Sequence, residues 1–149
     1  MNAMVATRPS ELQHCRLRLA TGPAAAGEAR GQVLATIRDW GVPVDADTAM
    51  LLTSELVTNA IACETSETIM LGIRRLHGGL RVDVYDTSVS FPVVTVAAGD
   101  AEAGRGLMLV AALAAEWGFY RTPGGKAVYF ALLFSRDRPA SATSSPMLG

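Results

Sequence analysis

The stretch Ser54-Glu55-Leu56-Val57-Thr58-Asn59-Ala60 lies within a strong helical pattern of the 149-residue chain. It places a carboxylate and a carboxamide four residues apart, which brings the two groups into one volume beside a helix. Further along, Gly104-Arg105-Gly106-Leu107 places a glycine-flanked arginine at the start of an almost wholly apolar segment. Glu55, Asn59 and the glycine-flanked Arg105 are therefore candidate functional residues.

Alternating and helical patterns on either side of these stretches predict five strands and three helices. The expected strands are residues 15–19, 67–75, 80–85, 119–122 and 127–134, and the expected helices are residues 24–40, 47–63 and 107–116. Gly41 is expected to end the first helix and Gly118 the third. His77-Gly78-Gly79 and Pro123-Gly124-Gly125 are expected to form hairpin turns. A short apolar piece, residues 93–96, lies in the long connection between the expected strand at 80–85 and the expected helix at 107–116.

This order, with two hairpins and no strict strand–helix alternation, predicts an α+β fold. We expect a two-layer sandwich with an antiparallel or mixed sheet and helices on one face. The length fits one domain, residues 11–134, between a flexible lead at 1–10 and a disordered tail at 135–149.

Composition narrows the class of partner. The net charge is −1 and no region is strongly basic, which disfavours direct nucleic-acid binding. The longest apolar run, residues 107–115, is too short to span a membrane, and no signal peptide is apparent. Cys15 and Cys63 are too few for a disulfide framework, so we expect a cytoplasmic protein with reduced thiols.

The helix at residues 47–63 has two distinct faces. Its expected core arc consists of Ala49, Met50, Thr53, Leu56, Val57, Ala60 and Ile61. Glu55, Asn59, Ala62 and Cys63 fall on the opposite side. Spacing alone favours a solvated polar face, but the small, weakly polar groups after Asn59 favour the wall of a cleft. If it is a cleft, Glu55 can act as a general base and Asn59 can offer a neutral oxygen to Mg²⁺.

Two further features fit a phosphate-bearing ligand, each beside a structural alternative. Asp86 ends a strand and can accept a hydrogen bond from an exocyclic amine, or it can close an Asx turn. Gly104, Arg105 and Gly106 precede an expected helix N-terminus, which favours an anion, or they form a plain glycine-rich helix start. The small-residue loop at 97–103 is expected to form a lid.

Taken together, the motifs resemble the gyrase/histidine-kinase ATPase superfamily over residues 12–134. More narrowly, they are similar to its branch of small bacterial anti-sigma regulatory serine/threonine kinases. The resemblance rests on Glu55-Leu56-Val57-Thr58-Asn59-Ala60, on residues 81–92, on residues 102–110, and on residues 114–118 with Gly124-Gly125-Lys126.

The resemblance implies a Bergerat-type α/β sandwich that binds Mg²⁺-ATP and phosphorylates a serine of an anti-anti-sigma protein. A sigma factor is often a second partner, and members commonly dimerise. The implied roles are the general base for Glu55, the Mg²⁺ ligand for Asn59, and contact with the adenine amine for Asp86. The implied nucleotide contacts also include Ser88, Gly104, Arg105, Gly106 and Leu107.

Three positions depart from the pattern of that branch. Cys63 stands where histidine is usual, Ser88 replaces a glycine, and Ala127 replaces a threonine. These departures motivate a second hypothesis, a nucleotide-binding module without catalysis that sequesters a sigma factor or a related regulator. A third hypothesis, a small-molecule enzyme with Glu55 as base, is weaker because His14 and His77 lie near no motif.

Overall fold

A computed structural model describes residues 13–63, 66–88 and 102–135, apart from the side chains at positions 63 and 102–105. Within these residues the elements follow one another as β2 (His14–Ala20), α1 (Ala25–Trp40), α2 (Ala46–Cys63), β3 (Thr68–Arg75), β4 (Gly79–Asp86), α3 (Glu102–Leu113), β5 (Glu116–Thr122) and β6 (Gly125–Leu133). The predicted order of elements is therefore confirmed.

The strands form one five-stranded sheet in the order β2-β3-β4-β6-β5. Every neighbouring pair is antiparallel, so the mixed alternative is wrong for the described strands. The β3–β4 and β5–β6 hairpins are local, whereas β4 pairs with β6 across a long connection that includes α3 and β5. That pairing sets Val82 opposite Phe130 and Asp86 opposite Lys126.

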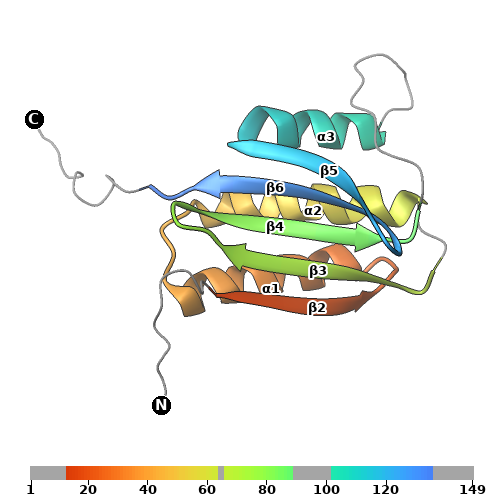
Figure 1. Cartoon of the computed structure of the whole chain (residues 1–149), viewed down its shortest axis with the longest axis horizontal. Coiled ribbons are helices and arrows are strands. Elements are labelled where there is room, and N and C mark those ends of the chain that lie inside the picture. Colours follow the sequence, from red (N-terminus) through yellow and green to blue (C-terminus); the bar gives the residue numbers. More distant parts are fainter. Residues whose placement is uncertain (1–12, 64–65, 89–101, 136–149) are drawn as a thin grey trace, which may run out of the picture.

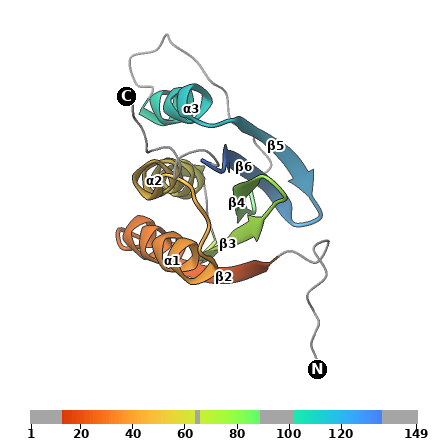
Figure 2. The ribbon, with the colours of Figure 1, turned by 90° about the vertical axis from the view of Figure 1, so that its left-hand side faces the viewer.

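All three described helices cover the same face of the sheet, which gives two layers (Figures 1 and 2). Strand residues that point toward the helices are buried, as Ile69, Leu71 and Ile73 of β3 illustrate. Their burial fits the predicted α+β sandwich. The opposite face of the sheet carries the alternate residues and is covered by none of the described helices.

Helix α1 ends where its sequence predicts. Gly41 takes the left-handed conformation at φ 65°, and its N–H donates to the carbonyl of Arg38. A glycine adopts this conformation without the steric cost that a side chain would add. Val33 and Ile37 of α1 are buried, and Trp40 packs against the core in part.

Helix α2 lies between α1 and α3 and against the sheet (Figure 2). The predicted core arc is confirmed for Ala49, Thr53, Leu56, Val57 and Ala60. The buried surface is wider than that arc, because Leu52 and Asn59 are buried as well. A helix with neighbours on three sides needs more than one apolar stripe.

The boundaries between α3 and β5 differ from the prediction. Helix α3 begins at Glu102 and ends at Leu113, so the predicted helix at 107–116 is wrong at both ends. Strand β5 begins at Glu116 and contains Gly118. The ladder to β6 explains the difference, because Glu116 pairs with Ala131 and the N–H of Ala115 already donates to the Ala131 carbonyl.

Several predictions concern segments outside the described residues, namely the lead at 1–10, the apolar piece at 93–96, positions 97–101 of the expected lid and most of the expected tail. Positions 102 and 103 of that lid belong to α3. Ser135, the first residue of the expected tail, donates its N–H to the carbonyl of Pro43. Within the described residues, no helix combines the length and apolar character needed to cross a membrane.

Candidate functional site at the ends of α2, α3 and β4

Asn59 is a buried polar side chain without a partner in the described part of the chain. Its side chain is only 5% exposed, and it makes no hydrogen bond to any residue in the described ranges. Burying an amide without a partner costs roughly 1–3 kcal/mol, so most buried amides are satisfied. The first prediction for this face, open solvent, is wrong at Asn59, whereas Ala62 on the same face is exposed. An unsatisfied amide at this depth fits a ligand.

Glu55, one turn before Asn59, lies directly against helix α3. A Cβ added at Gly106 would stand 2.5 Å from Glu55 Oε1 and 3.6 Å from its Cδ. Only a glycine lets the carboxylate approach the α3 backbone so closely. Glu55 is half-buried, and its carboxylate has no hydrogen bond or ion pair with another described residue. The structure therefore brings Glu55 and Gly106 together, as their assignment to one site predicts.

The glycine segment lies within α3 and not ahead of it. Because α3 begins at Glu102, the backbone N–H groups left free by the helix are those of residues 102–105. Gly104 and Arg105 belong to this first turn, so the prediction that Gly104, Arg105 and Gly106 precede a helix beginning at Leu107 is wrong. The Leu107 side chain is buried in the core. Any anion at this helix end would meet the backbone of the first turn.

Asp86 ends β4 in a fully enclosed position. Its Oδ1 accepts a hydrogen bond from the Ser88 N–H at 2.8 Å, so the Asx-turn alternative is confirmed. Lys126 of β6 donates to both carboxylate oxygens, at 2.9 Å to Oδ1 and 2.8 Å to Oδ2. The side chains of Asp86 and Lys126 are 0% and 1% exposed. Sequence reasoning assigned no role to Lys126, although it belongs to the closing hairpin that carries the resemblance.

Figure 1 places the C-terminal end of α2, the end of β4 and the beginning of α3 at the same end of the molecule. Glu55, Asn59 and Asp86 all stand on the side of the sheet that faces the helices. Hydrogen-bonding groups therefore gather at one end of the two layers. No group of three or more histidine, cysteine, aspartate or glutamate side chains in the described ranges is arranged to hold a metal.

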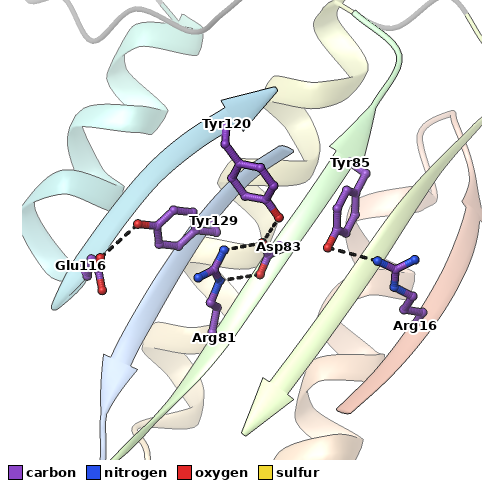
Figure 3. Close-up of polar contacts among 7 residues, drawn as sticks. All are labelled: Arg16, Arg81, Asp83, Tyr85, Glu116, Tyr120 and Tyr129. Carbon is purple, nitrogen blue, oxygen red and sulfur yellow. Dashed lines mark hydrogen bonds and ion pairs between the residues drawn. The ribbon is translucent and has the colours of Figure 1, made fainter. Parts of the chain in front are cut away.

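A second polar cluster occupies the other face of the sheet (Figure 3). Arg81 makes two hydrogen bonds of 2.9 Å to Asp83, and its guanidinium lies 3.9 Å from the centroid of the Tyr129 ring. Tyr120 donates to Asp83 at 2.8 Å, and Tyr129 donates to Glu116 at 3.1 Å. The alternation of Arg81 and Asp83 along β4 is the sequence signal that could have identified this cluster.

These contacts shift the acidity of the cluster. The hydrogen bonds and charge of Asp83 raise the pKa of Arg81 despite its partial burial. Burial, followed by hydrogen bonds with Tyr85 and Asp83, raises the pKa of Tyr120. Burial and the hydrogen bond to Glu116 raise the pKa of Tyr129. The cluster ties β4, β5 and β6 together on the face opposite Glu55 and Asn59.

A two-layer α+β sandwich with Glu55, Asn59 and Asp86 at one end is the arrangement of the Bergerat ATPase class. The model of the histidine kinase-like ATPase domain matches residues 19–132, and the chain belongs to this family. Membership confirms the predicted superfamily and supports ATP binding. No curated protein matches the chain. The anti-sigma branch and the roles of the individual residues stay predictions.

Proposed function

We propose that the chain is a cytoplasmic, ATP-dependent serine/threonine protein kinase of the anti-sigma type. Its substrate would be a serine of an anti-anti-sigma partner, through which it would regulate transcription, and it would act as a homodimer. The observation that carries the proposal is the buried Asn59 amide one turn from the Glu55 carboxylate, neither of which has a hydrogen-bond partner among the described residues. Membership of the histidine kinase-like ATPase family supports ATP as the nucleotide.

Each group of the site has a role in this proposal. Asn59 offers its amide oxygen to Mg²⁺, which keeps most of its remaining ligands as waters and phosphate oxygens. Bound Mg²⁺ would neutralise charge on the phosphates. The first-turn N–H groups of α3, with Arg105, would hold phosphate oxygens. Glu55 would accept the proton of the attacking serine hydroxyl. Asp86 and Ser88 would lie beside the adenine ring.

The test is phosphoryl transfer to a purified anti-anti-sigma protein from the same genome, with labelled ATP and Mg²⁺. Glu55→Gln should lower the initial rate by about 10²-fold or more while leaving ATP affinity within a few-fold, because a base acts on the transfer step. Glu28→Gln is the matched control, since Glu28 is an exposed carboxylate on α1. Equal rates for wild type and Glu55→Gln would remove the catalytic assignment.

A second candidate function is a nucleotide-binding module that sequesters a sigma factor without phosphorylating a partner. The observation in its favour is that Cys63, Ser88 and Ala127 stand where the anti-sigma branch usually carries histidine, glycine and threonine. Calorimetry with ATP and ADP separates the two functions when combined with the transfer assay. Binding without transfer favours the module, and no binding removes both.

A further inference from the structure

Lys126 is the single lysine of the chain, whose other twelve side-chain cations are arginines. It is also one of the most deeply buried side chains, at 1% exposure, with its ammonium group against Asp86. Lysine is rarely buried unless it is paired. A chain that uses arginine everywhere else therefore places its one lysine on β6, opposite Asp86 at the end of β4.

The pair leaves hydrogen-bonding capacity unused. An ammonium group has three N–H donors, and two of those on Lys126 go to Asp86. The third has no acceptor among the described residues. On Asp86, Oδ1 accepts from both Ser88 and Lys126, whereas among the described residues Oδ2 accepts from Lys126 alone. One donor and one acceptor therefore remain, on atoms 2.8 Å apart.

A donor beside an acceptor matches one edge of adenine, which presents an amine hydrogen next to an unprotonated ring nitrogen. We propose that Lys126 donates its third N–H to ring nitrogen N1 of adenine while Asp86 Oδ2 accepts from the 6-amino group. This inference rests on the proposed nucleotide binding and adds a specificity residue to it. Lys126 would position the base and take no part in phosphoryl transfer.

The alternative is a purely structural ion pair, and its physics is less favourable. A buried ion pair gains little stability over apolar side chains of similar volume, because both charges lose their hydration. Arginine would also satisfy a purely structural carboxylate with its planar fork. The unused third N–H is the feature that a structural role does not require.

The single lysine makes a direct test possible on the unmodified chain. Protein labelled with ¹⁵N and ¹³C in lysine gives one side-chain signal set, which needs no assignment. It would be titrated with Mg²⁺ and ATP, then with 1-deaza-ATP, which carries C–H in place of N1, and with purine riboside triphosphate, which lacks the 6-amino group. Calorimetry measures each affinity in parallel.

We expect ATP to shift the Lys126 Nζ and Hε signals at saturation. 1-deaza-ATP should bind roughly tenfold or more weakly and leave these signals near their free positions, because a hydrogen bond from a charged donor is lost. Purine riboside triphosphate should also bind more weakly but still shift the lysine signals. Inosine triphosphate is avoided because its ring nitrogen carries a hydrogen.

Two results would overturn the inference while leaving nucleotide binding intact. The first is ATP binding by calorimetry with unchanged lysine signals, and the second is equal affinity for ATP and 1-deaza-ATP. Absence of any nucleotide binding would instead remove the proposed function and this inference with it. Lys126→Met serves as an added arm, in which ATP and 1-deaza-ATP should bind equally. If that variant does not fold, the wild-type titrations still decide.

Discussion

The carboxylate of Glu55 on α2 occupies the space that a side chain at Gly106 of α3 would need. A Cβ at position 106 would stand 2.5 Å from Glu55 Oε1, closer than side chains tolerate. The far end of a glutamate can move, so an added methyl group would displace the carboxylate and leave the helices in place. The contact therefore fixes where the proposed general base points.

Gly106→Ala should accordingly separate activity from stability. Replacing glycine by alanine inside a helix stabilises it by roughly 0.5–1 kcal/mol, which offsets the local crowding. We expect the melting temperature to change by only a few degrees, and phosphoryl transfer to fall by about tenfold or more, since displacements of about 1 Å at a reacting group are costly. Circular dichroism and the transfer assay measure the two effects.

Gly31→Ala is the matched control for this variant. Gly31 lies in α1, and a Cβ there would meet nothing within 4 Å. It should show the gain in helix stability with unchanged transfer. If Gly106→Ala and Gly31→Ala behave alike in the transfer assay, the Glu55–Gly106 contact has no role in activity.

The tyrosines of the outer face predict a loss of stability at alkaline pH. Because the pKa of Tyr120 is raised in the folded chain, the folded state keeps its phenol proton at a pH where the unfolded state has lost it. Stability from this group is therefore fully present below about pH 10, the ordinary tyrosine pKa, and is lost as the pH rises through the folded pKa. Tyr129 adds a shift in the same direction.

Urea unfolding between pH 8 and pH 11 tests this dependence. Wild type should lose free energy of unfolding above about pH 10, at no more than about 1.4 kcal/mol per pH unit for each tyrosine. Tyr120→Phe should lose about 1 kcal/mol at pH 8, because its hydrogen bond to Asp83 is gone, and then decline less steeply. Parallel curves for the two proteins would contradict the assignment to Tyr120.

Local patterns were sufficient to predict much of this fold, and long-range register was not. The β3–β4 hairpin and the end of α1 at Gly41 depend on neighbouring residues, and both were predicted closely. The start of β5 depends on its ladder with β6, which no local pattern reports. Helix propensity in the alanine-rich residues 111–115 therefore extended the predicted helix too far.

At the site, too, local features could be predicted from the sequence and long-range contacts could not. The spacing of Glu55 and Asn59 is local and identified both residues. Burial of Asn59 was not predictable from one helical stripe, because α2 packs against α1, α3 and the sheet together. The partner of Asp86 lies 40 positions away, on a strand brought alongside by a non-local pairing. A lone lysine in the sequence is a signal, but it does not name its partner.

The Asp86–Lys126 pair should be fragile when only one partner is removed. Lys126→Met leaves a buried carboxylate without its cation, which should cost about 3–5 kcal/mol in the free energy of unfolding. The double variant Asp86→Val with Lys126→Met should recover most of this loss, because apolar groups then replace both charges. Chemical unfolding of wild type, the single variants Asp86→Val and Lys126→Met, and the double variant at one pH measures the effect as a double-mutant cycle.

The outer-face pair of Arg81 and Asp83 provides the comparison for this cycle. The Arg81 side chain is 25% exposed, and Tyr120 continues to donate to Asp83 when Arg81 is replaced. Arg81→Met should therefore cost less than Lys126→Met. If the double variant at the buried pair loses as much as the two single variants added together, the two charges do not compensate one another.

Asn59→Leu should stabilise the nucleotide-free chain while abolishing its response to nucleotide. Leucine has the branching and the number of non-hydrogen atoms of asparagine but presents no polar atom, so it removes the amide that costs roughly 1–3 kcal/mol when it has no partner. We expect the melting temperature without nucleotide to rise by several degrees. Wild type should gain further stability with saturating Mg²⁺ and ATP, as any ligand of the folded state provides, and Asn59→Leu should not.

Thr58→Leu, at the exposed neighbouring position, should change neither quantity strongly. A lower melting temperature for Asn59→Leu without nucleotide would mean that the amide is already satisfied, and would remove the observation on which the proposed Mg²⁺ ligand rests.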